Sequence, residues 1–333
     1  LQLLFEICQS SGIKCLILHT AKSSSTCMIS DNPRKMNIDF PENTLENTSK
    51  DFGELKSYFH DSKRVSQVTN LVKSMNNSSS TSTLFKYLKS DNSNVETHFT
   101  YLGRNKSKVI LWYTLDVLKT KYRKKFIDKN LMSQIPSNEK FVYFPLHMDM
   151  EQYPLIAAPF YTNQIEFIRS LAKSLPVDYE LYVKEHPGNA LRSWRKTSDY
   201  NEIMSIPNVK LFHPSLSSEE LYEKCSLVIT IAGTSGFEAG LFGKPSITFA
   251  DLNYIALPHV HRATSLEELP ETIRKMLKVK VNPSDMHHLL SIYRKNEINF
   301  DWWNFQQQIN DTFFQSGKMF NIDIPISTME KFL

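Results

Sequence analysis

The chain has 333 residues, of which 41% are hydrophobic and 22% charged. This composition supports a packed core and excludes a mainly disordered protein. The net charge of +4 is too small to indicate nucleic-acid binding, and no apolar run approaches the ~20 residues of a membrane-spanning helix. The four cysteines follow no metal-binding spacing, so with no signal peptide in view we expect a cytoplasmic protein.

The first 138 residues predict one partial N-terminal α/β domain. Residues 1–20 predict a helix, a turn at Gly12 and a buried strand. Because the chain opens inside such a unit without Met, we expect an N-terminal truncation. The region 74–94 begins with a polar tract of low complexity, which predicts a loop or insert. No motif in this part identifies an acceptor site.

Residues 109–126 predict a helix with one apolar face and many basic side chains at its other positions. The surrounding stretch, 102–140, holds ten Lys or Arg and three Asp or Glu. Two interpretations stay open. The basic positions 117–126 form a solvated helix face, or they contact an anionic membrane surface or a phosphorylated acceptor.

From Glu139 on, apolar strand-like segments alternate with helical ones, which predicts a parallel sheet covered on both faces. We expect one doubly wound domain over 139–282. The aromatic tail 283–333 should begin as a helix and pack back on the domains. The predicted strands are 140–147, 180–187, 208–214, 227–234 and 244–250.

Ligands of open parallel sheets bind beyond the carboxyl ends of the strands, and polar residues follow three of the predicted strands. The first strand is followed by His147 and Glu151, and Gln164 opens the next helix. These three side chains are placed to reach a cleft. The alternative is that they are ordinary polar residues of a loop.

The second strand end carries Lys184, Glu185 and His186, followed by a proline that stops the strand. A lysine and a histidine at a strand end can hold a phosphate or a sugar carboxylate. The alternative is a surface charge pair beside a structural histidine. The same His-Pro dipeptide recurs at His213, where no Lys-Glu pair precedes it and we expect only a structural role.

The third strand end contains a glycine cluster. The chain has nine glycines, and four of them lie within eleven residues, at 233, 236, 240 and 243. Gly233 and Gly236 permit a tight turn and the close approach of a ligand. Thr234 and Ser235 offer hydroxyls, and the start of the next helix suits a phosphate. The alternative is a ligand-free capping box of Ser235 and Glu238.

The two later glycines of this cluster have a different expected role. Gly240 fits close packing of the helix on a strand, and Gly243 fits the end of that helix before Lys244-Pro245.

Together these segments resemble the capsule polysaccharide biosynthesis family, which includes the Kdo transferases of capsule assembly. The matching pieces run in order from Phe144 to Tyr254: FPLHMDMEQYP, NQIEFIRSLAKSLP, LYVKEHP and ITIAGTSGFEAGLFGKPSITFADLNY. The resemblance implies a GT-B glycosyltransferase with two Rossmann-like domains, the N-terminal one truncated here. The C-terminal domain would bind a nucleotide-sugar donor, with no metal and no other cofactor.

The resemblance also implies roles for the site residues. His186 would contact the donor phosphate, and the glycine loop would take the same phosphate from the neighbouring strand end. Lys184 and Glu185 would shape the pocket. On chemical grounds His186 is also a candidate acid for the departing phosphate, and Glu185 is the second catalytic candidate. Glu238 would meet a ribose or sugar hydroxyl. The donor-binding group is Lys184, Gly233, Thr234, Ser235, Gly236 and Glu238, and the cleft group is His147, Glu151 and Gln164.

The predicted function is metal-independent transfer of a sugar, with a CMP-linked acid sugar among the candidate donors, to a glycan or lipid-linked acceptor. The partners would be that nucleotide sugar, the acceptor and an anionic membrane face, and no nucleic acid. The protein would work at the inner face of the membrane. The alternatives are a teichoic-acid-type polyol-phosphate transferase, a sugar-nucleotide epimerase and a non-catalytic nucleotide- or glycan-binding partner in capsule assembly.

Overall fold

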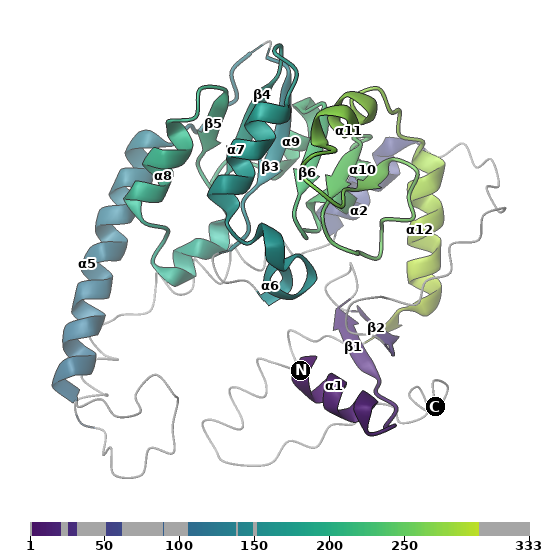
Figure 1. The fold of residues 1–333 in the computed structure, drawn as a ribbon, viewed down its shortest axis with the longest axis horizontal. Helices are drawn as coiled ribbons and strands as arrows, with labels where there is room; N and C mark the ends of the chain where they lie inside the picture. Colours follow the sequence, from purple (N-terminus) through teal and green to yellow (C-terminus); the bar gives the residue numbers. More distant parts are fainter. Residues whose placement is uncertain are drawn as a thin grey trace.

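The computed structural model describes residues 2–20, 26–31, 51–61, 89, 106–137, 139–148 and 152–299 (Figure 1). The expected insert at 74–94, apart from Lys89, and the tail beyond residue 299 lie outside the described residues.

Six parallel strands form the main sheet, in the order β5-β4-β3-β6-β7-β8. They are β3 Phe141–Pro145, β4 Glu180–Lys184, β5 Val209–Phe212, β6 Leu227–Thr230, β7 Ser246–Thr248 and β8 Val260–Arg262. The strand order runs outward in both directions from β3 and β6, which is the Rossmann arrangement, with its switch point between these two strands. The prediction of a doubly wound parallel sheet is confirmed.

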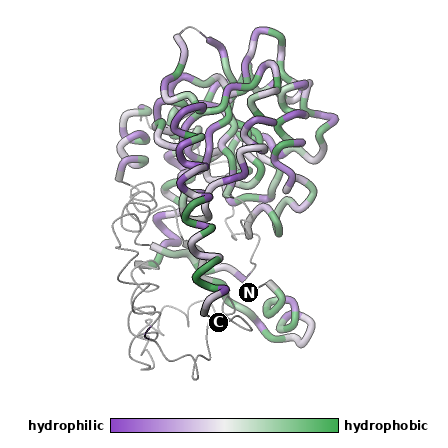
Figure 2. Tube along the Cα trace, turned by 90° about the vertical axis from the view of Figure 1, so that its left-hand side faces the viewer, coloured by the Kyte–Doolittle hydropathy of each residue, from purple (hydrophilic) through white to green (hydrophobic). Residues whose placement is uncertain are grey.

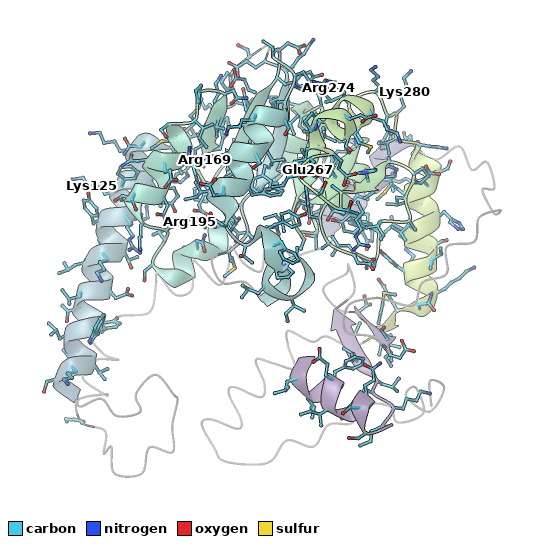
Figure 3. All side chains as sticks on the ribbon, viewed as in Figure 1. Lys125, Arg169, Arg195, Glu267, Arg274 and Lys280 are labelled. Atoms are coloured by element: carbon cyan, nitrogen blue, oxygen red, sulfur yellow. The ribbon has the colours of Figure 1, made fainter. Side chains whose placement is uncertain are left out.

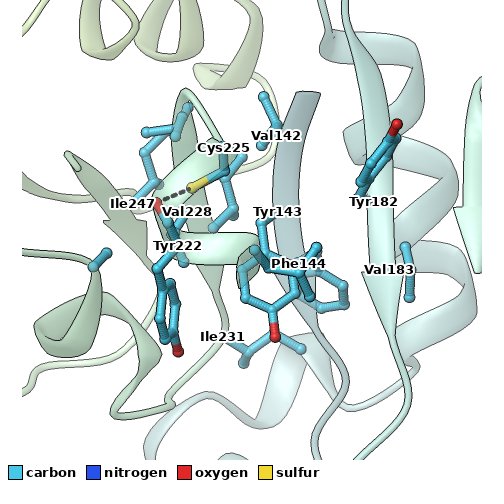
Figure 4. Packing of buried hydrophobic residues seen from close by; sticks show 14 of the residues in the cluster. Val142, Tyr143, Phe144, Tyr182, Val183, Tyr222, Cys225, Val228, Ile231 and Ile247 are labelled. Carbon is cyan, nitrogen blue, oxygen red and sulfur yellow. Dashed lines mark hydrogen bonds between the residues drawn. The ribbon is translucent and has the colours of Figure 1, made fainter. Parts of the chain in front are cut away.

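The inner strands β4, β3, β6 and β7 are buried on both faces, as their apolar sequences predict. In β3, Tyr143 and Phe144 point to opposite faces because side chains alternate along a strand. The Phe144 ring lies 5.4 Å from Phe167 of α7 (Gln164–Ser174). The Tyr143 ring lies 5.6 Å from Tyr222 of α9 (Ser218–Lys224). Figure 4 shows Tyr143, Phe144 and Tyr222 in this packed core.

Helices cover both faces of the sheet (Figure 1). The face with α7 also has α8 (Thr197–Met204), which contacts β5 and α7, and α11 (Leu269–Met276), which packs on α7. The face with α9 has α10 (Ser235–Leu241), which contacts β6 and β7. Outside α10 lie α2 (Phe52–Asp61) and α12 (Pro283–Asn296). Short helices follow two of the strands: α6 (Gln152–Ala157) and then η1 (Pro159–Tyr161) come after β3, and η2 (Pro187–Arg192) comes after β4.

A small antiparallel sheet lies apart from the main one. The helix α1 (Gln2–Ser10) leads through Gly12, at φ +70°, into β1 (Ile17–Thr20), so the predicted helix, turn and strand are confirmed. The strand β1 pairs with β2 (Thr26–Ser30), and β2 pairs with β9 (Ile298–Asn299). The second Rossmann-like domain stays a prediction, because much of 1–138 lies outside the described residues.

The basic helix is longer than predicted. It is α5, Lys106–Asn130, and its C-terminal half packs on the main domain through Ile127 and through Phe126, whose ring stacks 6.3 Å from Tyr200. The N-terminal half projects away from the domain (Figure 1). Hydrophobic residues gather along that half in Figure 2, and several of them are exposed: Leu111, Trp112, Tyr113, Leu115 and Leu118.

Candidate functional site

His147 occupies the switch point of the sheet. It follows β3, and its imidazole Nε2 lies 3.3 Å from the main-chain nitrogen of Ala232 and 3.4 Å from Thr230 Oγ1, both at the end of β6. The side chain is buried, with 7% of its surface exposed. His147 therefore joins the carboxyl ends of the two strands between which doubly wound sheets bind their ligands.

The glycine loop after β6 is packed tightly against this histidine. A Cβ atom at Gly233 would lie 2.7 Å from Thr230 Oγ1 and 3.3 Å from His147 Cε1. A Cβ atom at Gly236 would lie 2.6 Å from the hydroxyl of Tyr254, which donates to the Gly233 carbonyl. Both positions therefore require glycine because of the neighbouring side chains alone, independently of any ligand that the loop binds.

The later glycines serve packing and the helix end. A Cβ atom at Gly240 would lie 2.6 Å from Met286 Sδ of α12, so α12 can approach α10 closely only at a glycine. Gly243 has φ +71°, a left-handed conformation that ends the helix at little cost for this residue type.

Glu238 accepts hydrogen bonds from two side-chain hydroxyls. Thr234 Oγ1 donates to one carboxylate oxygen at 2.7 Å, and Tyr222 donates to the other at 2.7 Å. Ser235 is the first residue of α10, and its buried hydroxyl has no hydrogen-bond partner. The alternative of a capping box between Ser235 and Glu238 is therefore wrong, because the N-cap is Thr234 and Ser235 caps nothing.

Lys184 belongs to the same polar cluster. Its ammonium is buried, with 7% exposed, and donates to Ser218 Oγ at 2.7 Å. Burial lowers the pKa of Lys184 from 10.5 to about 8, and the nearby Glu238 carboxylate opposes that shift. The structure thus brings Lys184, Thr234 and Glu238 together on the α9–α10 side of the sheet, with Ser218 and Tyr222 as partners that the sequence reasoning missed.

Glu185 points to the opposite face and is fully buried. Its carboxylate accepts from Arg195 Nε at 3.0 Å, from the Tyr200 hydroxyl at 2.7 Å and from Asn189 Nδ2 at 2.9 Å. The main-chain N–H of His186 donates to it as well. Four donors on one buried carboxylate favour the shaping role that the resemblance implies for Glu185 over its candidacy as a catalytic residue.

His186 caps the short helix η2. Its Nδ1 accepts from the main-chain N–H of Gly188 at 3.0 Å, so a neutral ring carries its proton on Nε2. The ring is half-buried. Nε2 is therefore the nitrogen that can donate a hydrogen bond or a proton to a ligand.

Gln164 was expected to reach a cleft, but it is buried and bound to the main chain of His147. Its Oε1 accepts from the His147 N–H at 2.8 Å, and its Nε2 donates to the His147 carbonyl at 3.3 Å. It therefore fixes the position of the histidine. The third cleft candidate, Glu151, lies outside the described residues.

Arg195 is the main residue that sequence reasoning missed. Besides its ion pair with Glu185, its Nη2 donates to the His147 carbonyl. Figure 3 shows Arg195 within the main domain, close to η2, whereas Lys125 points outward from α5. No motif marks Arg195, since it stands nine residues after His186 of the His-Pro dipeptide. Its guanidinium joins the two polar strand ends.

The strand order corrects one expectation about distance. The strand β3 lies between β4 and β6, so His186 and the glycine loop follow strands two positions apart and are not neighbours. Two strand spacings are about 10 Å. His147 fills the position between them and is the histidine next to the glycine loop.

Within the ranges that the structure describes, no group of three or more His, Cys, Asp or Glu side chains is placed to hold a metal ion. In the same ranges, no helix has the length and apolar character needed to cross a bilayer.

A family model described as "Capsule polysaccharide biosynthesis protein" matches residues 66–268, which is more than half of the chain. No curated protein sequence matches the chain.

Several solved structures resemble the chain at low similarity. The β-Kdo 2,7 transferase KpsC of Thermosulfurimonas dismutans is 10% identical, with 86% of this chain and 79% of that chain covered and a TM-score of 0.39. The UDP-GlcNAc 2-epimerase of Methanocaldococcus jannaschii, in complex with UDP-GlcNAc and UDP, is 16% identical, with 54% and 52% covered and a TM-score of 0.34. The UDP-GlcNAc 2-epimerase of Neisseria meningitidis is 19% identical, with 56% and 52% covered and a TM-score of 0.33.

The chain spans about half the length of the first solved structures that it matches, 54% and 52%.

Proposed function

Because the chain belongs to the capsule polysaccharide biosynthesis family, we propose that it is a glycosyltransferase of surface polysaccharide assembly. It transfers a sugar from a nucleotide-activated donor to a glycan or lipid-linked acceptor. One observation carries the proposal: within the family-matching segment, the motif residues surround the switch point of a Rossmann-type sheet, where such folds bind nucleotides.

The donor phosphate lies, in this proposal, over the glycine loop and His147, with His186 approaching from the β4 end. The hydroxyl of Ser235 is buried without a partner beside this loop, which supports a polar ligand there. The sugar-bearing side of the donor faces the Thr234–Glu238 pair. Glu238 would then accept from a ribose or sugar hydroxyl in addition to its present donors.

The chemistry requires a group that stabilises negative charge on the departing nucleotide. At neutral pH Lys184 is a cation, because its pKa of about 8 lies above that pH. His186 Nε2 can donate a hydrogen bond to the same phosphate or transfer a proton to it as the bond to the sugar breaks. We propose that these groups act without a metal ion. The base that activates the acceptor would come from outside the described site.

We also propose that α5 contacts an anionic membrane surface. Exposed Leu111 and Leu118 stand beside exposed Lys121 and Lys125 on this helix, a combination that suits the interface of an anionic bilayer. Arg123 has a different task, because it donates to two carbonyls of the main domain. The basic residues that we assign to the membrane contact are therefore Lys121 and Lys125.

A thermal-shift panel of CMP, UDP and GDP on the full chain tests the donor site. We expect one nucleotide to raise the melting temperature, and CMP would do so if the donor is a CMP-linked acid sugar. Stabilisation by UDP or GDP alone would contradict the CMP version. If no nucleotide stabilises the folded chain, the proposed donor site is wrong.

Product analysis separates the remaining alternatives. A glycosyltransferase releases the nucleotide when donor and acceptor are both present, whereas an epimerase converts the nucleotide sugar without releasing it. A polyol-phosphate transferase moves a phosphoalcohol and leaves nucleotide sugars unchanged. A non-catalytic partner binds nucleotide or glycan and converts neither.

A further inference from the structure

We propose that Arg195 is a positioning residue that holds His147 and His186 in a fixed relation, and that Arg123 of α5 maintains the turn that places Arg195. The catalytic consequence of this inference rests on the proposed glycosyltransferase function, but the geometry stands independently of it.

Arg195 joins the two histidine-bearing strand ends through separate nitrogens. Its Nε forms an ion pair with Glu185 Oε2 at 3.0 Å, and Glu185 in turn accepts from the N–H of His186. Its Nη2 donates to the carbonyl of His147. The arginine is 7% exposed and Glu185 is fully buried, so solvent hardly screens this pair. A shift of the guanidinium would move the β3 end relative to the β4 end.

The fork shape of the arginine side chain suits this task. A guanidinium offers several N–H donors in one plane, and it can therefore serve a carboxylate and a carbonyl at once in a fixed geometry. A lysine carries the same charge on one flexible nitrogen. Arginine at position 195 is thus expected to be more than a counter-ion for Glu185.

The backbone before Arg195 has an unusual conformation. Ser193 has φ +61° and Trp194 has φ +59°, and these are the two non-glycine residues with positive φ among those described. Residues that carry a side chain rarely adopt this left-handed backbone conformation, so two such residues in succession persist only when neighbouring groups stabilise them. The turn directs the chain back from η2 so that Arg195 enters the domain.

Arg123 supplies that support. Its Nη1 donates to the Ser193 carbonyl at 3.0 Å and to the Trp194 carbonyl at 2.9 Å. Asp116, seven residues earlier and on the same face of α5, accepts from Ser193 Oγ at 2.7 Å. The helix α5 therefore forms hydrogen bonds with both residues of the left-handed turn. A continuous series of contacts runs from α5 through this turn and Arg195 to the two histidines.

The test compares Arg123→Met and Arg195→Lys with Lys129→Met, a control that removes an exposed positive charge from the same helix, six residues from Arg123. The first readout is the set of imidazole signals in NMR spectra of the full chain with isotope-labelled histidine, without any ligand. The second is kcat and KM for the donor that the wild-type protein uses.

We expect Arg123→Met and Arg195→Lys to fold, to shift the imidazole signals of His147 and His186, and to lower kcat at least tenfold with a smaller change in KM. Lys129→Met should match the wild type in both readouts. Unchanged imidazole signals in Arg123→Met would show that the hydrogen bonds from Arg123 to the turn do not position the histidines. Unchanged signals in Arg195→Lys would show that the planar guanidinium of Arg195 is not required.

The two readouts also separate this inference from the proposed function. If the wild-type chain binds no nucleotide and turns over no donor, the proposed function fails, while the imidazole signals still decide whether Arg195 and Arg123 position the histidines.

Discussion

Replacing Lys184 by methionine should stabilise the fold and remove turnover. The ammonium is buried, and burial lowers its pKa from 10.5 to about 8. This difference corresponds to about 2 to 4 kcal/mol of folding free energy lost by keeping the charge inside the protein. Methionine has a similar length and occupies the same position without a charge. Loss of the hydrogen bond to Ser218 Oγ costs about 1 kcal/mol.

The net gain expected at pH 7 is therefore roughly 1 to 3 kcal/mol in the free energy of unfolding. The pH dependence of the free energy of unfolding tests the sign of this change independently. The folded pKa of Lys184 is about 8 and the unfolded value 10.5, so between these pH values the unfolded state binds more protons. The stability contribution of Lys184 therefore rises with pH across that window. The advantage of Lys184→Met should shrink from pH 8 to pH 10.

Urea denaturation of the full chain at pH 7 and pH 10 measures both effects, with turnover measured beside it. Lys173→Met, on the exposed side of α7, is the matched control and should change neither quantity. A Lys184→Met variant that is less stable than the wild type at pH 7, by the same amount at both pH values, would refute the reasoning. A more stable variant that keeps full turnover would remove Lys184 from the donor site.

Three further predictions concern other parts of the molecule. His259 is buried, both of its ring nitrogens lack partners, and burial lowers its pKa from 6.5 to about 4. Between pH 4 and pH 6.5 the unfolded state thus binds more protons than the folded state, so the melting temperature of the wild type should fall from pH 6.5 to pH 4. The fall should be smaller in His259→Leu, and an equally steep fall in the variant would contradict this role of His259. Gly236→Ala places a Cβ 2.6 Å from the Tyr254 hydroxyl, so it should cost about 1 to 3 kcal/mol in urea denaturation; adding Tyr254→Phe should recover part of this, and no recovery would show that the clash lies elsewhere. The pair Lys121→Glu and Lys125→Glu should weaken binding to anionic vesicles about tenfold or more, and unchanged binding would leave α5 with a merely solvated basic face.

The sheet was predictable because its strands are short, apolar and separated by helical segments. The five predicted strands all exist, and the sixth, β8, was missed because its three residues, Val260–Arg262, include two polar side chains. The helix α11 begins at Leu269, after a loop in which the Glu268 side chain accepts from the main-chain N–H groups of Thr264 and Ser265.

The contacts within the site were harder to predict. Lys184 and Glu185 are adjacent in the sequence and were assigned to one pocket, but strand alternation sends them to opposite faces of the sheet. That separation could have been read from the sequence. The position of Arg195 could not, since it depends on a left-handed turn at Ser193 and Trp194, residues whose types do not favour that conformation.

The central claim is most directly tested by measuring nucleotide release from the donor identified in the thermal-shift panel, with acceptor present, for His186→Ala and His213→Ala. The two histidines precede proline after neighbouring strands, but the His213 ring lies beside Ser215 and Asp128 at 2.5 and 3.2 Å and has no place at the switch point. We predict that His213→Ala releases nucleotide like the wild type, and that His186→Ala folds and releases none. Equal release by both variants would contradict a donor site at the β4 end of this sheet.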